Sequence, residues 1–348
     1  MKPDKRIENL NVFAEEEIIT PSELKTEYPL TEKAVSTVMN GQQTIRNILS
    51  RKDKRKFIVV GPCSIHDPES ALEYAHKLNK LSEEVSENLF LVMRSYFEKP
   101  RTSIGWQGLI NDPWLDNSCK IEDGLRIARK LLLNIAEIGL PAAGEALDLI
   151  TPQYLQDLFS WTAIGARTTE SQTHRKMASG FSCAVGFKNG TDGNINVAVN
   201  AIKSALYPNN FVSINPDGHS AIVRTKGNKN THIVLRGGGG KTNYDSANIK
   251  KCENILMKAD LPVRIMVDCS HDNSNKDPDK QKDVIQNIVK QIRGGNKSIV
   301  GLMIESNLKS GNQDYLNKSN NLEYGVSITD ACLSFDETEE AIRVFSRY

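Results

Sequence analysis

Short apolar runs rich in β-branched residues recur along the chain, and segments with a helical pattern separate most of them. Examples of the helical segments are residues 121–139 and 279–295. Alternating strands and helices predict a parallel sheet covered by helices. About eight such units favour a closed (β/α)8 TIM barrel, with an open doubly wound sheet as the alternative. The apolar runs are 57–61, 89–93, 140–147, 162–166, 183–187, 232–236, 264–268 and 299–304.

Two segments do not fit this repeat. Residues 211–225 form two apolar runs around Asn215-Pro216-Asp217-Gly218, a turn signal that predicts a β-hairpin inserted between barrel units. Residues 1–50 form an N-terminal extension whose second half has a helical pattern, with Thr31 as the expected N-cap. We therefore expect an extension that serves assembly or regulation, and a catalytic barrel over residues 51–348 that carries the hairpin.

Composition limits the partners and the compartment. The 348 residues include 44 basic and 43 acidic side chains, a formal net charge of +1, which gives no electrostatic reason to expect nucleic acid or an anionic membrane as partner. No apolar run approaches the roughly 20 residues of a membrane helix, and the charged N-terminus does not resemble a signal peptide. Six cysteines without a CxxC pair argue against a disulfide scaffold or a zinc ribbon. These features predict a cytoplasmic protein with reduced thiols.

Residues just beyond the C-terminal ends of barrel strands meet in one pocket. In this chain they are unusually rich in cations, and the segment FEKPRTS adds two more. Buried cations repel one another and are costly to desolvate, so such a group implies anionic ligands. Arginine is well suited to carboxylate and phosphate oxygens. The strand-end positions are Cys63, Arg94, Glu145, Arg167, Lys188, Arg236, His271 and Glu305, and the added cations are Lys99 and Arg101.

A second set near the strand ends consists of Cys63, His271, Glu305 and Asp330. A thiolate, an imidazole and two carboxylates combine soft and hard donors, which suits Mn²⁺, Fe²⁺, Co²⁺ or Zn²⁺ better than Mg²⁺. Two other interpretations of Cys63 stay open on the residues alone. It could be a nucleophile with His66 or His271 as its base, or a buried small hydrophobic residue.

Two glycine-rich segments do not carry a nucleotide site. RGGGGKT resembles a phosphate loop, but Leu235 stands where that motif requires its first glycine. The segment 186–194 lacks the glycine spacing of a dinucleotide fold. We expect neither a nucleoside triphosphate nor a dinucleotide.

Longer motifs identify a family. GPCSIHD, MRSYFEKPRTSIGWQGLINDP, ITPQYLQDLFSWTAIGARTTESQTHRKMASG, VGFKNGTDGN, HIVLRGG, VDCSHDNS, IES and SITDAC closely resemble segments of the microbial, feedback-regulated type I 3-deoxy-D-arabino-heptulosonate 7-phosphate (DAHP) synthases. The resemblance runs from about residue 30 to the C-terminus. It implies condensation of phosphoenolpyruvate with erythrose 4-phosphate and release of phosphate, the first step of the shikimate pathway.

The resemblance also implies residue roles. Cys63, His271, Glu305 and Asp330 match the ligands of one divalent metal ion, which would polarise the aldehyde or activate a water. Lys99 and a water at the metal are candidate proton donors, and Lys99, Cys63 and His271 form the expected catalytic set. The residues matching phosphoenolpyruvate contacts are Arg94, Lys99, Arg167, Lys188 and Arg236, and those matching erythrose phosphate contacts are Arg101 and Thr102.

In the family, the extension of one subunit and the hairpin of another help to build an aromatic amino-acid site in a dimer or tetramer. Phenylalanine-sensitive members tend to have serine at the position of Ser213 and tyrosine-sensitive members glycine, so the resemblance favours phenylalanine as inhibitor. The alternative is that Ser213 only pairs across the hairpin. The residues matching this effector site are Asp148, Pro152, Gln153, Ser182, Phe211, Ser213 and Val223.

The chain departs from the family pattern at several loop positions. The segment 236–244 has an extra residue, and Asp272 stands where alanine is common. Other departures are Ala146, Ala184, Thr242 and Cys269. None removes an expected ligand or cation, which argues against a catalytically inactive amino-acid sensor. A related synthase that condenses phosphoenolpyruvate with another sugar phosphate is the remaining alternative.

Overall fold

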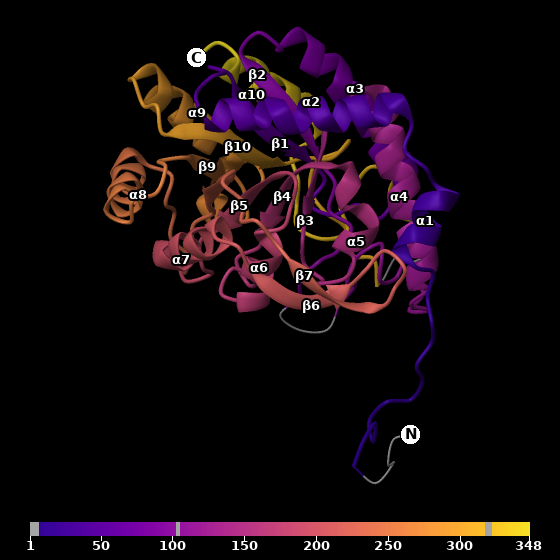
Figure 1. The fold of residues 1–348 in the computed structure, drawn as a ribbon. Helices are drawn as coiled ribbons and strands as arrows, with labels where there is room; N and C mark the ends of the chain where they lie inside the picture. Colours follow the sequence, from indigo (N-terminus) through magenta and orange to yellow (C-terminus); the bar gives the residue numbers. More distant parts are fainter. Residues whose placement is uncertain (1–6, 102–104, 317–321) are drawn as a thin grey trace.

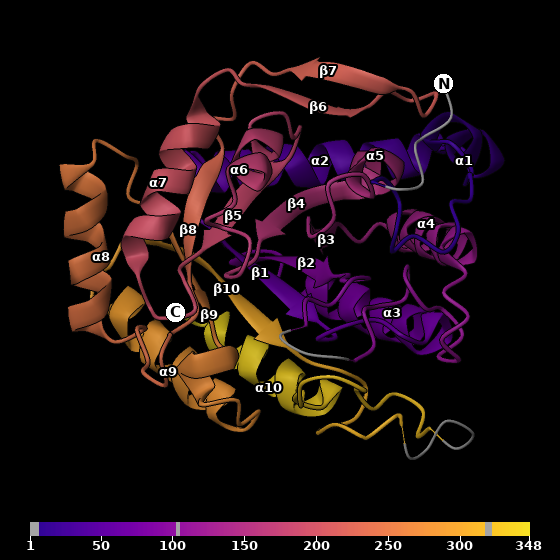
Figure 2. The same ribbon diagram turned by 90° about the horizontal axis from the view of Figure 1, so that it is seen from below.

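Eight parallel strands close into a barrel in the computed structural model, which describes residues 7–101, 105–316 and 322–348 (Figures 1 and 2). The hydrogen-bonded order is β1, β10, β9, β8, β5, β4, β3, β2, and β2 pairs with β1 to complete the circle. This closure confirms the predicted (β/α)8 barrel over the open sheet. The strands are β1 Lys56–Gly61, β2 Leu89–Arg94, β3 Ala142–Glu145, β4 Phe159–Ile164, β5 Ala184–Lys188, β8 Thr231–Leu235, β9 Ile265–Asp268 and β10 Ile299–Glu305.

The largest difference between a predicted and an observed strand is at β4, which begins three residues before the apolar run at 162–166. The polar Ser160 interrupts the apolar pattern in this part of the sequence. In the structure Ser160 is fully buried, and its hydroxyl donates to the Val38 carbonyl oxygen at 3.3 Å. A satisfied hydroxyl can be buried at little cost, so the strand extends through it.

Helices surround the barrel (Figure 2), and capping residues in the sequence mark where several of them begin and end. Asp67 accepts hydrogen bonds from the first turn of α3, and Pro68 occupies its first position. Gly139, with φ of 99°, ends α4 in the left-handed conformation. In the described residues no helix is long and apolar enough to cross a membrane. The outer helices are α3 Pro68–Glu84, α4 Ile121–Ile138, α6 Gln172–Ala178, α7 Ile195–Leu206, α8 Ser246–Lys258, α9 Lys280–Arg293 and α10 Phe335–Phe345. Shorter elements are α5 Pro152–Leu155, η1 Gln156–Leu158 and η2 His271–Ser274.

The N-terminal segment contains α1 (Pro21–Glu27) and α2 (Glu32–Leu49), and Thr31 caps α2 as predicted. Helix α2 packs across the N-terminal ends of β1, β4 and β5. A Cβ at Gly41 would lie 2.3 Å from Ser160 Oγ, so this close approach requires glycine. Part of the predicted extension therefore covers the base of the barrel, and the division at residue 50 stays a prediction.

The inserted hairpin consists of β6 (Asn210–Ile214) and β7 (Ser220–Arg224), which form a two-stranded sheet separate from the barrel. Its bounds differ by one residue at each end from the predicted 211–225 segment. The side chains of Val212 and Ile222, which are cross-strand partners, are 75% and 64% exposed. The hairpin tip contacts α1, because Ser22 N donates to the Pro216 carbonyl oxygen at 2.8 Å.

The barrel interior is filled by side chains from α2 and from all eight barrel strands, including Phe57, Trp161 and Met266. Trp161 Nε1 donates to His232 Nε2 at 2.8 Å, so the one polar group of this large buried ring has a partner. Packing of the interior leaves the C-terminal ends of the strands as the open face of the barrel.

Candidate active site

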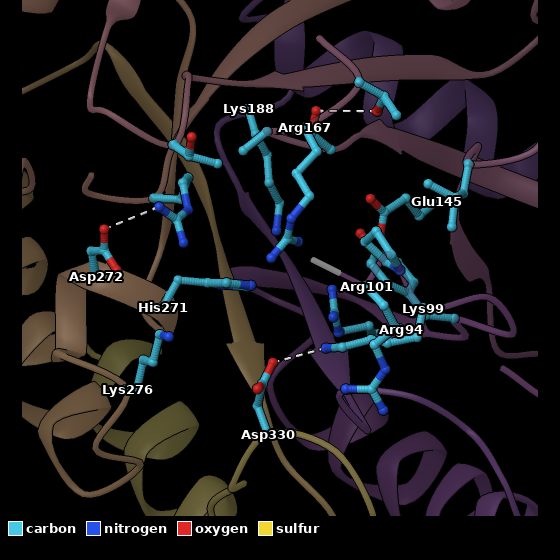
Figure 3. A pocket seen from close by; sticks show the side chains of 18 residues that line it. Arg94, Lys99, Arg101, Glu145, Arg167, Lys188, His271, Asp272, Lys276 and Asp330 are labelled. Carbon is cyan, nitrogen blue, oxygen red and sulfur yellow. Dashed lines mark hydrogen bonds and ion pairs between the residues drawn. The ribbon is translucent and has the colours of Figure 1, made fainter. Parts of the chain in front are cut away.

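A cavity of about 430 Å³ opens at the C-terminal ends of the barrel strands (Figure 3). Six of its cations were predicted from the sequence, and Lys276 was not. Lys276 follows η2 in the loop after β9, beyond the strand-end positions that the sequence analysis considered. The seven cations that line the cavity are Arg94, Lys99, Arg101, Arg167, Lys188, Arg236 and Lys276.

Arg94, the last residue of β2, lines the cavity and is only 2% exposed. Its Nη2 donates to Glu305 Oε1 at 2.9 Å and to the Cys63 carbonyl oxygen at 3.0 Å. Its guanidinium lies 3.6 Å from the centre of the Tyr96 ring. These contacts join β1, β2 and β10, so Arg94 fixes the position of Glu305 as well as adding charge.

One donor atom from each of Cys63, Glu305 and Asp330 lies within 4.8 Å of the others. His271 is not part of this group of three, but its Nε2 lies 4.0 Å from Glu305 Oε1. Its Nδ1 is held by Ser270 Oγ at 2.7 Å and Asp268 Oδ2 at 3.0 Å. Contacts of this kind orient the imidazole of a metal-binding histidine. The structure thus brings together three of the four predicted ligands and places the fourth beside them.

Lys99 contacts two of these donors. Its Nζ lies 2.8 Å from Cys63 Sγ and 2.8 Å from Asp330 Oδ2. Burial raises the pKa of the Cys63 thiol to about 11. Burial alone would raise the pKa of Asp330, but Lys99 holds it well below its ordinary value. The donor set of thiol, carboxylates and imidazole fits a divalent transition metal.

The nucleophile interpretation of Cys63 has less support from this geometry. A raised thiol pKa lowers the fraction of reactive thiolate. His66, one of its proposed bases, stacks edge-on against Trp106 with ring centroids 6.5 Å apart and does not line the cavity.

Two further cavity cations pair with acids at the C-terminal end of β9, and the sequence analysis did not identify these pairs. Lys188 Nζ pairs with the fully buried Asp268 at 2.8 Å, and Arg236 Nη1 pairs with Asp272 at 3.2 Å. Burial alone would raise the pKa of Asp268, but Lys188 and His271 hold it well below its ordinary value.

Of the two residues predicted to contact erythrose phosphate, Arg101 is described by the structure and Thr102 is not. Arg101 lines the cavity, and its Nε donates to the Trp106 carbonyl oxygen at 2.8 Å. Thr102 lies outside the described residues.

Comparison with known proteins identifies the family. The sequence profile of the DAHP synthetase I family matches residues 27–343. The chain belongs to the DAHP synthetase I family. The Tyr-sensitive phospho-2-dehydro-3-deoxyheptonate aldolase of Escherichia coli K12 is 52% identical over 97% of this chain and 94% of that protein. The Phe-sensitive enzyme of the same strain is 54% identical over 97% of this chain and 95% of that protein.

A solved structure agrees with this membership in the DAHP synthetase I family. The phospho-2-dehydro-3-deoxyheptonate aldolase of Francisella tularensis SCHU S4 superposes with a TM-score of 0.95 at 48% identity, covering 97% of this chain and 98% of that one. Because Tyr-sensitive and Phe-sensitive relatives have nearly equal identity to this chain, identity alone does not select an effector.

The effector residues expected for this DAHP synthetase I family member lie on three segments. Asp148 Oδ1 accepts from Thr151 N at 3.0 Å, just before Pro152 and Gln153 begin α5. The Ser182 carbonyl oxygen accepts from Arg46 Nη2 at 2.6 Å, just before β5.

On the hairpin, Phe211 is the cross-strand partner of Val223, and Ser213 is the partner of Ala221. Ser213 therefore pairs across the hairpin through its backbone, but its buried hydroxyl has no hydrogen-bond partner among the described residues.

Proposed function

We propose that the chain condenses phosphoenolpyruvate with D-erythrose 4-phosphate and water to give DAHP and phosphate, the first step of the shikimate pathway. The observation that carries this proposal is the 430 Å³ cavity lined by seven cations and by Asp330, whose carboxylate lies within 4.8 Å of the Cys63 and Glu305 donor atoms. Two phosphorylated substrates, one of them also a carboxylate, require a cationic pocket. An aldehyde substrate requires a Lewis acid.

The two substrates occupy different sides of this pocket. Phosphoenolpyruvate binds the side formed by β2, β4, β5 and β8, and erythrose 4-phosphate binds the loop after β2. Support comes from the cavity lining, which includes cations from both regions. The phosphoenolpyruvate contacts are Arg94, Lys99, Arg167, Lys188 and Arg236, and the erythrose phosphate contacts are Arg101 and Thr102.

Cys63, His271, Glu305 and Asp330 hold one divalent ion, which is Mn²⁺, Fe²⁺, Co²⁺ or Zn²⁺. When bound, the ion supplies Lewis-acid polarisation of the aldehyde carbonyl. The Ser270 and Asp268 contacts to Nδ1 of His271 support this assignment, because they leave Nε2 directed toward Glu305.

In the reaction, the enol carbon of phosphoenolpyruvate forms a bond to the aldehyde carbon. Water then adds to the neighbouring carbon, and the bond from that carbon to the phosphate oxygen breaks. Lys99 lines the cavity together with the other cations, and its Nζ contacts the donor cluster, which we define as Cys63, Glu305 and Asp330. Lys99 is therefore placed to hold or deliver a proton between the two groups. Arg167 and Arg236 orient the phosphoenolpyruvate oxygens.

The chain also responds to an aromatic amino acid, with phenylalanine favoured, and works as a homodimer or homotetramer. Two exposed apolar surfaces support association. Phe13 and Leu10 of the N-terminal segment are fully and 68% exposed, and the outer face of the hairpin presents Val212 and Ile222. If the N-terminal segment of one subunit contacted the hairpin of another, both apolar surfaces would be buried. The Ser213 hydroxyl is buried and has no hydrogen-bond partner within residues 7–101, 105–316 and 322–348, which supports a polar ligand on the inner face of the hairpin.

The test is an assay of the purified chain with both substrates after chelation and addition of Mn²⁺. We expect equal amounts of phosphate and DAHP, and no phosphate when either substrate is omitted. A five-carbon sugar phosphate in place of erythrose 4-phosphate tests the related-synthase alternative. Preferred use of the longer sugar, or no condensation product under any metal, would contradict the proposal.

A further inference from the structure

Asp272 forms an ion pair with one of the cavity arginines at the cavity wall. Its Oδ2 lies 3.2 Å from Arg236 Nη1, and the two side chains are 16% and 10% exposed. Figure 3 draws this pair, and both residues line the cavity. By contrast, Asp268, which pairs with Lys188, is fully buried and does not line the cavity. Asp272 is therefore an acid that a ligand at Arg236 would approach directly.

The same carboxylate faces the glycine loop 237–240. Gly240 N lies 3.4 Å from Asp272 Oδ2, and a Cβ at Gly237 would lie 2.7 Å from the Asp272 Cβ. The loop has other anchors, because Gly239 N donates to the Thr191 carbonyl oxygen and Gly237 N donates to Asn243 Oδ1. These anchors hold the loop without help from the carboxylate.

The backbone of Arg236 is anchored independently as well, since its N–H donates to Asn189 Oδ1 at 2.9 Å. The contact that Asp272 adds is to the guanidinium itself. A phosphate group arriving at Arg236 must share that guanidinium with a carboxylate and come close to a like charge.

We propose that Asp272 competes with phosphate-bearing ligands for Arg236 and thereby lowers the affinity of this pocket for them. This inference rests on the proposed function, in which phosphoenolpyruvate binds through Arg236 and phosphate is a product. Competition weakens the binding of both, so Asp272 limits inhibition by the released phosphate at the expense of substrate affinity.

The test measures equilibrium binding of inorganic phosphate and of phosphoenolpyruvate to the full chain by titration calorimetry. Asp272→Asn and Asp272→Ala should each bind both ligands about fivefold more tightly than the unchanged chain, the size expected for one partly exposed charge pair. The matched control is Asp277→Asn, in the same loop, which removes the same charge from an exposed ion pair with Lys280 at the start of α9. Its affinities should stay within about twofold of the unchanged chain.

A double-mutant cycle with Arg236→Ala separates competition for Arg236 from a general change in pocket charge. The gain from Asp272→Asn should disappear when Arg236 is absent. An equal gain in phosphate affinity without Arg236 would overturn the proposal. Weaker phosphate binding by Asp272→Asn would also overturn it, because Asp272 would then be a residue that positions the guanidinium. Thermal unfolding of each variant shows that it is folded before its affinity is compared.

The two proposals can fail separately. Phosphate binding does not depend on turnover, so tighter binding without any DAHP formation would contradict the proposed function alone. DAHP formation with unchanged binding in Asp272→Asn would contradict the competition alone.

Discussion

The ammonium of Lys99 lies between two atoms that also belong to the donor cluster, Cys63 Sγ and Asp330 Oδ2. In this arrangement the ammonium balances the charge of the Asp330 carboxylate and contacts the Cys63 sulfur. The divalent ion proposed above would be held by the same donors and would compete with the ammonium for them. Lys99 would then be released toward the cavity, where the proposed reaction needs a proton donor.

Loss of a proposed metal ligand should abolish metal-dependent turnover. We expect Cys63→Ala or His271→Ala to reduce the rate by at least about a hundredfold, because each would remove a ligand of the proposed metal ion. Metal content after dialysis should fall in parallel, while circular dichroism stays unchanged. Cys119→Ala, at an exposed cysteine, is the control and should keep full activity. Full activity in excess chelator after exhaustive dialysis would refute the metal assignment.

Removal of single cations should affect the two substrates differently. We expect Arg236→Ala or Arg167→Ala to raise KM for phosphoenolpyruvate about tenfold or more, because a lost charge-assisted contact costs about 1.5–3 kcal/mol. Arg101→Ala should instead raise KM for erythrose 4-phosphate. Steady-state kinetics with each substrate varied in turn is the measurement. Equal changes in both KM values for all three variants would contradict the division of the pocket.

Site residues at strand ends could be predicted from the strand pattern, and Lys99 and Arg101 from the segment FEKPRTS, whereas Lys276 could not. Arg94, Lys188 and Arg236 follow apolar runs directly, and parallel strands of a barrel all end on one face. Lys276 lies beyond a 3₁₀ turn, where no periodic pattern indicates the path of the chain. The acidic partner Asp272 was recognised only as a departure from the family pattern, and its contact with the lengthened glycine loop required the structure.

At the scale of elements, Glu98 links two loops that border the cavity. It precedes Lys99, is 8% exposed, and accepts from Thr151 Oγ1 at 3.0 Å in the loop after β3. Burial raises the pKa of this carboxyl to about 7, from an ordinary value of 4.5. The folded chain therefore holds the Glu98 proton more tightly than the unfolded chain.

The stability that this proton contributes is complete below pH 4.5 and is lost as the pH rises through about 7. Glu98→Gln cannot ionise, so relative to the unchanged chain it should gain about 2–3 kcal/mol of unfolding free energy between pH 5 and pH 8. Urea unfolding at both pH values measures the difference. Glu83→Gln, at an exposed position of α3, is the control. The same pH dependence with and without Glu98 would show that its carboxyl is already ionised at pH 5.

Long helices could be predicted from the sequence, whereas a short one was not. Helices α4 and α9 were predicted to within about two residues, because their apolar stripes and end signals agree. Helix α1 was missed, although Thr20, Pro21 and Glu23 form a capping box with proline in the first turn. With seven residues, α1 is too short to show helical periodicity, so only its cap could have revealed it.

At the scale of the whole molecule, the hairpin, α1 and α5 connect the outer surface to the barrel mouth. The hairpin tip contacts α1, and Tyr154 of α5 donates through its hydroxyl to the Ile19 carbonyl oxygen at 2.8 Å. An effector bound near these elements acts on the cavity only if it favours one of two conformations, commonly by 1–3 kcal/mol of coupling.

Phenylalanine should inhibit turnover more strongly than tyrosine or tryptophan. Replacement of Ser213 by glycine should weaken inhibition by phenylalanine relative to tyrosine, because it removes a buried hydroxyl that has no partner among the described residues. Separate titrations with the three amino acids, before and after the replacement, are the measurement. Ser204→Gly, on α7, is the control. Insensitivity to all three amino acids, or stronger inhibition by tyrosine in the unchanged chain, would show that a serine at position 213 does not indicate sensitivity to phenylalanine in this chain.

The donor cluster joins parts of the chain that are far apart in sequence, since Cys63 and Asp330 are separated by 267 positions. Its members flank the seam where β1 meets β10, the pairing that closes the barrel. During synthesis on the ribosome, residue 63 has to wait for almost the whole barrel to emerge before its partners exist. Chains that lack the last strand would have neither Glu305 nor Asp330, so the proposed metal site would form only after the barrel is complete.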